Sequence, residues 1–153
     1  MKTALREAIN KLSSGQVLVI GDLAIDEMVY GNTDRLSREA PVLILRHDHT
    51  NITLGAAGNA AHNIAKLGAK RSAILGVTGK DYHCSLLLDA LERDQVDASL
   101  LIQDESRPTT TKTRISGIAN QSVTQQIVRV DRESRQPLST KLELQLLETL
   151  NQV

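Results

Sequence analysis

The chain of 153 residues has few aromatic side chains, since it contains two tyrosines and neither tryptophan nor phenylalanine. Its core must therefore be built from Leu, Ile, Val and Ala. Proteins that bind bases or single-stranded nucleic acid by stacking need several exposed rings, so the composition argues against that class. Sugars and their phosphates remain reasonable ligands, because hydrogen bonds do most of the work of binding them.

The chain also has no net charge. Eighteen Lys and Arg residues balance eighteen Asp and Glu residues, which gives a formal net charge of zero. No overall field attracts nucleic acid or an anionic membrane surface, and we expect neither as a partner. Any binding of phosphate must depend on a local group of cations.

The sequence lacks an apolar run long enough to cross a bilayer, and it has no pair of cysteines. The longest apolar runs, at residues 17–20 and 42–45, have the length of strands. The N-terminus carries Glu7 and lacks the apolar core and cleavage site of a secretory signal. The lone Cys84 can form neither an internal disulfide nor a zinc site. We therefore expect a cytoplasmic protein without a metal site.

The hydrophobic pattern predicts an α/β fold in one domain, preceded by an amphipathic N-terminal helix within residues 1–15. Continuous apolar runs predict buried parallel strands, and alternating patterns predict more exposed ones that need a separate small sheet or lid. A final helix begins after Ser139, which can cap it. The buried strands are expected at 16–22, 72–77 and 100–102, and a half-exposed antiparallel pair at 109–116 and 126–130. Further strands are expected at 24–30 and 42–46, separated by a polar, turn-prone stretch at 31–41. The helices are expected at 57–67, 82–93 and 139–153.

The stretch from Leu54 to Ala69 joins a Gly/Ala turn directly to an amphipathic helix. Gly55 and Gly58 have no Cβ, so a ligand can approach the main chain and the backbone can take a positive φ angle. Asn59 adds a side-chain amide where free helix N–H groups point outward. The turn suits a polyhydroxylated or anionic ligand, but the glycines alone could equally serve close packing.

Three basic residues fall on the expected lid strands. Lys112 and Arg114 alternate on one face of a strand, and Arg129 lies on the strand that should pair with it. In a chain without net charge, three cations on one face would form a local phosphate site. The alternative is a solvated surface on which these cations pair with residues such as Asp131.

Five segments in order resemble the amino-terminal half of the ribokinase-like (PfkB) carbohydrate kinases, and within them the heptose 7-phosphate kinases of ADP-heptose synthesis. The resemblance makes residues 16–153 the amino-terminal portion of such a kinase domain, with lid strands at about 24–46 and 109–131. The segments are V-I-G-D-L-A-I-D-E-M-V-Y-G (19–31), R-L-S-R-E-A-P-V-L-I-L (35–45), the Gly/Asn turn and helix (54–69), L-G-V-T-G-K-D (75–81) and T-T-T-K-T-R-I with Q-Q-I-V-R-V-D-R-E (within 109–133).

The resemblance implies an incomplete ribokinase-like three-layer α/β sandwich with a small β-sheet lid that can form a homodimer contact. It also implies ATP-dependent phosphoryl transfer to an alcohol group of a sugar or sugar phosphate, with heptose 7-phosphate as the expected acceptor. Asp26 matches the family's hydroxyl-binding acid, because a carboxylate accepts hydrogen bonds from two sugar hydroxyls. The implied substrate-binding residues are Asp26, Gly55, Gly58, Asn59, Lys112, Arg114 and Arg129.

The sequence departs from the family pattern in two ways. Ala56 stands where the family turn usually has a second glycine, and its methyl group is expected to narrow the approach to the backbone. The family's G-A-G-D segment, which carries the catalytic Asp, does not occur. We therefore expect no catalytic residue in this chain. The complete family enzyme uses ATP and Mg²⁺, but neither is expected to bind this chain alone.

These sequence features are compatible with two functions. The chain is either the acceptor-binding half of a kinase, inactive by itself, or a non-catalytic truncated module for sugar-phosphate binding or dimerisation. A dinucleotide-binding domain is a poor third candidate. Gly21 ends a buried strand, but the residues after it are Asp, Leu and Ala rather than the remainder of G-x-G-x-x-G.

Overall fold

The computed structural model describes residues 2–118 and 123–153. After helix α1 (Lys2–Leu12), strand β1 (Gln16–Ile20) pairs in parallel with β4 (Arg71–Leu75), and the short strands β5 (Val77–Thr78) and β6 (Ile102–Gln103) form a second parallel pair. The apolar runs correctly predict β1 and β4 as parallel strands. The expected burial of β1 is wrong, since Val17 and Ile20 are 38% and 55% exposed. The pair β5 and β6 lies at the ends of the predicted strands 72–77 and 100–102.

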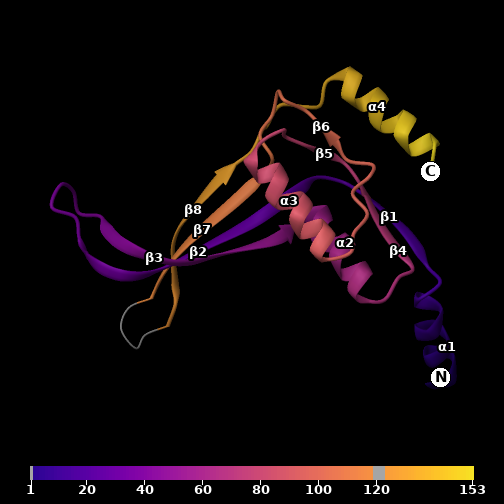
Figure 1. Cartoon of the computed structure of the whole chain (residues 1–153), viewed down its shortest axis with the longest axis horizontal. Coiled ribbons are helices and arrows are strands. Elements are labelled where there is room, and N and C mark those ends of the chain that lie inside the picture. Colours follow the sequence, from indigo (N-terminus) through magenta and orange to yellow (C-terminus); the bar gives the residue numbers. More distant parts are fainter. Residues whose placement is uncertain (1, 119–122) are drawn as a thin grey trace.

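A four-stranded sheet forms the lid and extends away from the parallel strands (Figure 1). Its order is β3-β2-β7-β8, in which β2 pairs antiparallel with β3 and parallel with β7, and β7 pairs antiparallel with β8. The expected antiparallel pairing of the last two lid strands is confirmed. The four strands are β2 (Leu23–Leu36), β3 (Leu43–Gly55), β7 (Thr111–Ile118) and β8 (Gln125–Arg132).

The hairpin of β2 and β3 is longer than the sequence predicts. The polar stretch 31–41 was expected to be a turn, yet β2 continues to Leu36 and β3 extends to Gly55. Register shifts after Tyr30 and after Thr33 absorb the irregular sequence. Gly31 lies at the first shift, where a Cβ would come within 2.9 Å of the Arg46 carbonyl oxygen, so glycine allows the strands to approach.

Helices α2 (Ala56–Lys66) and α3 (Tyr82–Arg93) carry the core and agree with the predicted helices within about a residue. Helix α2 packs on β1 and β4, and α3 packs on β2 and β3. Asp81 caps α3 and accepts hydrogen bonds from the main-chain N–H groups of Cys84 (2.9 Å) and Thr109 (3.0 Å). The buried cluster consists of Leu23, Ile25, Leu54, Ala61, Ile74, Leu87, Ala90, Leu91 and Val96.

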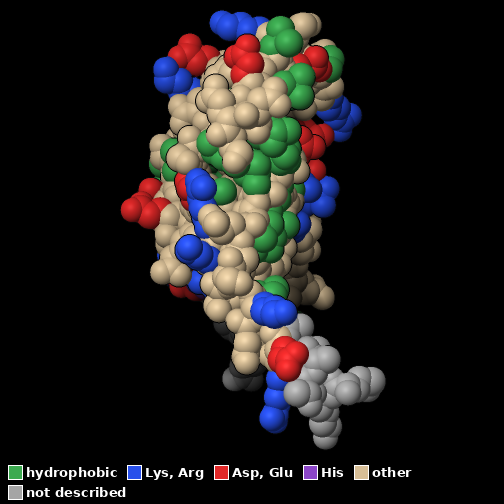
Figure 2. Space-filling model, turned by 90° about the vertical axis from the view of Figure 1, so that its right-hand side faces the viewer, with side chains coloured by type: hydrophobic (Ala, Val, Ile, Leu, Met, Phe, Trp, Pro, Cys, Tyr) green, Lys and Arg blue, Asp and Glu red, His purple; other side chains and the backbone are tan. Residues whose placement is uncertain are grey.

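Helix α4 (Thr140–Asn151) is capped by Ser139 as expected, through a 3.4 Å bond from the Leu142 N–H, but none of its residues is buried. It stands apart from α2 and α3 (Figure 1). Strand β1 pairs with β4 along one edge, and Ile20 is 55% exposed. Figure 2 shows hydrophobic side chains along the side that carries β1, β4 and α4. The sandwich is therefore incomplete.

No helix among the described residues is both long and apolar enough to span a membrane.

Asp97 holds the chain after α3 against strand β4 through hydrogen bonds of its main chain and of its carboxylate. The Asp97 main chain donates to the Ser72 carbonyl oxygen (2.8 Å) and accepts from the Ile74 N–H (3.0 Å). Its carboxylate accepts hydrogen bonds from the Ser99 N–H (2.9 Å) and from Arg71 (2.6 Å). Hydrogen bonds from Ser99, followed by those from Arg71, lower the pKa of Asp97 to about 2.

This low pKa predicts how stability depends on acid. The ionised Asp97 contributes stability above its ordinary pKa of 3.8, and that contribution is lost as the pH falls from about 4 through about 2. Asp97→Asn should lower the free energy of unfolding at pH 7 by about 1–2 kcal/mol and flatten its decline between pH 4 and pH 2. Urea unfolding at several pH values measures both effects. Parallel pH profiles for wild type and Asp97→Asn would contradict the prediction.

Candidate functional site

The pairing of β2 with β7 brings the acidic and basic candidate residues together. Asp26 is the register partner of Lys112, and Met28 is the partner of Arg114. Residues two apart on a strand share a face, so both cations lie on the face that carries Asp26. Arg114 forms an ion pair with the Asp26 carboxylate, and both side chains are partly buried, with 31% and 26% of their surface exposed.

The turn between β3 and α2 lies against the same carboxylate. A Cβ on Gly55 would come within 3.1 Å of Asp26 Oδ2, so glycine leaves room for the carboxylate at this point. Gly55 precedes the first turn of α2 and offers no side-chain cap. The Ala57 N–H donates to the Asp22 carbonyl oxygen (3.0 Å), and the exposed Asn59 lies in the same turn.

The positive φ angle in this turn is at Ala56, where φ is 48°, and not at the glycines that were expected to adopt it. Gly55 has a φ of −110°, and Gly58 lies inside α2 against Leu54. A positive φ angle suits glycine, which the resemblance described above leads us to expect at this position. The side chain here is a methyl group, and we expect a strain of about 1 kcal/mol.

Asp26 and Lys112 line two different cavities. Lys112 and Ala56 line the larger one, of about 720 Å³, whereas Asp26 and Asn59 line the smaller one, of about 400 Å³. Gly55 and Gly58 line neither. The two charged groups thus line different cavities, Lys112 the larger one and Asp26 the smaller one.

The three candidate cations share one face of the lid but differ in their partners. Arg114 and Arg129 are register partners, which brings like charges opposite each other. Each is neutralised separately, Arg114 by Asp26 and Arg129 by Asp131 at 2.8 and 2.9 Å. Within the described part of the chain, Lys112 makes no ion pair. The net positive charge of this face therefore resides at Lys112.

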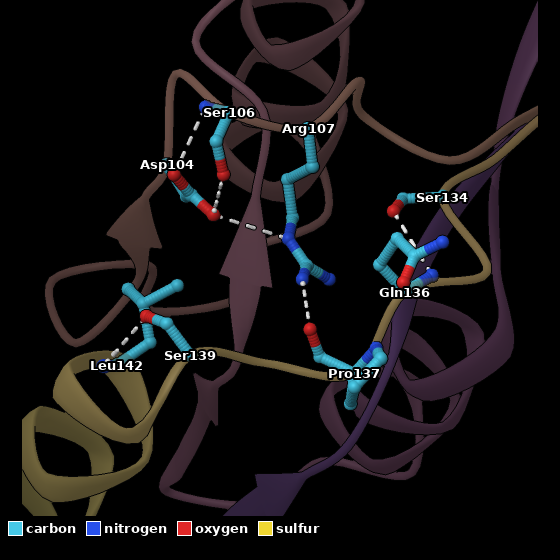
Figure 3. A network of polar contacts seen from close by, with 8 residues as sticks. All are labelled: Asp104, Ser106, Arg107, Ser134, Gln136, Pro137, Ser139 and Leu142. Atoms are coloured by element: carbon cyan, nitrogen blue, oxygen red, sulfur yellow. Dashed lines mark hydrogen bonds and ion pairs between the residues drawn. The ribbon is translucent and has the colours of Figure 1, made fainter.

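Arg107 is a wall residue of the larger cavity that the sequence reasoning missed (Figure 3). Its Nε donates to Asp104 (3.2 Å) and its Nη2 donates to the Pro137 carbonyl oxygen (3.3 Å). Main-chain and side-chain hydrogen bonds from Ser106 lower the pKa of Asp104 and so keep it ionised beside the guanidinium. The link ties the loop before β7 to the segment before α4. No local spacing in the sequence could indicate such a contact.

A second polar group beside the smaller cavity was also unassigned from the sequence. His62 Nδ1 lies 2.9 Å from Asp94 Oδ2, and Lys66 and Arg93 lie 3.5 and 3.6 Å from the same carboxylate. Burial raises the pKa of Asp94, but the positive charges of these three neighbours outweigh it and lower the pKa overall. Asp94 thereby joins α2 to the end of α3.

The described residues offer no cluster of metal ligands. Across residues 2–118 and 123–153, no three His, Cys, Asp or Glu side chains come together in a way that could hold a metal ion. We therefore name no Mg²⁺ ligand among them.

Comparison with known proteins decides the family. The sequence profile described as pfkB family carbohydrate kinase matches residues 14–152. The chain belongs to the pfkB family of carbohydrate kinases. It is 42% identical over 142 residues to bifunctional protein HldE of Trichlorobacter lovleyi, and 43% identical over 140 residues to bifunctional protein HldE of Helicobacter hepaticus. These alignments cover 93% and 92% of this chain but only 28% of each relative.

Solved structures of pfkB-type kinases show the same ribokinase-like α/β fold. Escherichia coli phosphofructokinase-2 aligns with a TM-score of 0.64 at 16% identity, over 91% of this chain and 41% of that protein. Arabidopsis thaliana ribokinase, solved with ribose and ATP, aligns with a TM-score of 0.58 at 16% identity, over 89% of this chain and 43% of that protein. The chain thus spans less than half of each of these two kinases.

The strain at Ala56 is testable. Ala56→Gly should raise the free energy of unfolding by about 1 kcal/mol, because glycine adopts a positive φ angle without a steric cost. Chemical denaturation of the purified chain measures the change. Ala60→Gly, an exposed position further along α2, is the matched control and should lower stability by about 1 kcal/mol. Equal decreases in the free energy of unfolding of the two variants would show that Ala56 is not strained.

Proposed function

We propose that this chain is the acceptor-binding half of an ATP-dependent sugar kinase and that it binds a sugar phosphate, with heptose 7-phosphate as the expected acceptor. The observation that carries the proposal is that the pairing of β2 with β7 places Lys112 opposite Asp26, whose carboxylate lies against the Gly55 turn. Lys112 and Asp26 each line a cavity. Family membership and the HldE relatives support sugar phosphorylation as the reaction class. The sequence segments described above favour heptose.

The proposed division of labour follows from charge. Asp26 accepts hydrogen bonds from sugar hydroxyls, and the Asn59 amide both donates and accepts them, so that the two groups together complement a polyol. Lys112, which makes no ion pair among the described residues although Asp26 and Asp131 are its register partners, binds the phosphate already carried by the sugar. The absence of a Cβ at the buried Gly55 leaves room for the Asp26 carboxylate.

The proposal predicts that a substitution of Lys112 weakens the binding of a phosphorylated sugar more than the binding of the same sugar without phosphate. Lys112→Gln should weaken binding of heptose 7-phosphate about tenfold and leave binding of free heptose unchanged, because only the first ligand carries an anion. Isothermal titration calorimetry measures both affinities. Lys70→Gln serves as the control, since Lys70 is exposed and lines neither cavity. Equal losses for both ligands would exclude Lys112 as the phosphate ligand.

Phosphoryl transfer itself is assigned to additional polypeptide. The chain covers 28% of the HldE relatives, and Ile20 on β1 and Leu144 on α4 expose apolar surface that such polypeptide would cover. In pfkB kinases as a family, ATP and Mg²⁺ are expected to bind in that additional part. The cytoplasmic location expected from the sequence belongs to the same proposal.

A complementation experiment tests this assignment. The segment of Trichlorobacter lovleyi HldE that follows its region of similarity is produced separately and mixed with this chain. We expect a complex, and ATP-dependent phosphorylation of heptose 7-phosphate that neither part gives alone. Asp26→Asn should form the complex but lose most of the activity. Activity of the separate segment without this chain would contradict the assignment.

A non-catalytic role in dimerisation is the second candidate. Exposed apolar side chains on β8 favour it, with Val128 and Val130 at 45% and 54% exposure on one face of the strand. A second copy of the chain would cover them through the lid. A complex that forms with the HldE segment but never phosphorylates a sugar would favour this candidate over the kinase.

A further inference from the structure

Arg114 differs from Lys112 in what it contacts, although both lie on the same face of β7. Its guanidinium is joined to the Asp26 carboxylate, whereas Lys112 faces the larger cavity. An arginine with a carboxylate partner offers little free charge to a ligand phosphate. Arg114 therefore has another role available, which is to fix the carboxylate itself.

We propose that Arg114 is a positioning residue for Asp26 in the acceptor-sugar site, and not a ligand of the substrate phosphate. The inference rests on the proposed function, since it concerns how the same site holds the sugar. It divides the basic residues of β7 into two kinds. Lys112 recognises the anion, and Arg114 orients the group that recognises hydroxyls.

The surroundings of Asp26 explain why it needs such a partner. Its carboxylate is only 26% exposed, and the Gly55 backbone closes on its Oδ2 side. Arg114 is paired with Asp26 Oδ1. One oxygen is thus held by a rigid planar cation, while the other faces the turn that leads to Asn59. A carboxylate fixed in this way loses less rotational freedom when it binds a hydroxyl.

The opposite strand supports the same division. Arg114 lies directly across from Arg129, which is neutralised by Asp131. Without Asp26, two arginines would face each other and only Arg129 would keep a carboxylate partner, Asp131, which would be unfavourable. The pairing with Asp26 therefore serves the sheet as well as the site, and a test must separate the two.

The experiment compares Arg114→Gln, Arg114→Lys, Asp26→Asn and the double variant Asp26→Asn/Arg114→Gln. Calorimetry gives their affinities for heptose 7-phosphate and for free heptose, and thermal unfolding shows that each is folded. We expect Arg114→Gln to weaken binding of both sugars by the same factor, about tenfold. Arg114→Lys, which keeps the charge, should recover part of the loss, and the double variant should bind no worse than Asp26→Asn alone.

Each other result overturns the inference. A loss restricted to heptose 7-phosphate would make Arg114 a phosphate ligand like Lys112. If the fold decreases in affinity of the two single variants multiply in the double variant, the two residues act independently. If Arg114→Gln binds both sugars as tightly as wild type, Arg114 does not belong to the site. If Arg114 served only the stability of the sheet, Arg114→Gln would lower the melting temperature but would not weaken the binding of both sugars by the same factor.

Failure of the proposed function gives a different result, because the wild-type chain would then bind neither sugar. In that case, the affinities of the variants for inorganic phosphate test the inference. Asp26→Asn should bind phosphate severalfold more tightly than wild type, because the substitution leaves Arg114 without its carboxylate partner. The double variant should lose that gain. Equal phosphate affinities for wild type and Asp26→Asn would show that Asp26 does not control Arg114.

Discussion

The parallel pairing of β2 with β7 is the constraint on which the rest of the site depends. Strand β2 begins in the core at Leu23 and Ile25 and continues into the lid, so one strand joins the two parts of the molecule. Its neighbour β7 comes from much later in the chain and brings the basic residues beside Asp26. The buried start of β2 therefore fixes where the acidic and basic groups of the lid lie.

The sequence predicts much of the fold because its local patterns are strong. The apolar run at 16–20 indicates a parallel strand, and Ser139 indicates the start of α4; both are observed. The length of β2 is missed because residues 31–36 are polar and turn-like, whereas cross-strand pairing and two register shifts keep them in a sheet. Tertiary contacts override local preference at this point.

The candidate site is less predictable for a related reason. Alternation correctly places Lys112 and Arg114 on one face, but it cannot show that Arg114 pairs with a carboxylate 88 residues away. The link from Arg107 to Pro137 spans 30 residues and is equally invisible to spacing. The positive φ angle at Ala56 contradicts the usual preference for glycine, so composition points to the wrong residue. Charge neutralisation and strain arise from the assembled fold.

The register between β1 and β4 has a consequence for how the chain folds. Gln16 pairs with Arg71, so the entire β2–β3–α2 segment lies between the two strands in sequence. On a ribosome, β1 emerges long before its partner exists, whereas the β2–β3 hairpin can form as soon as it is synthesised. The lid hairpin thus has the local contacts to fold early, and the parallel strands beneath it must wait for loop closure.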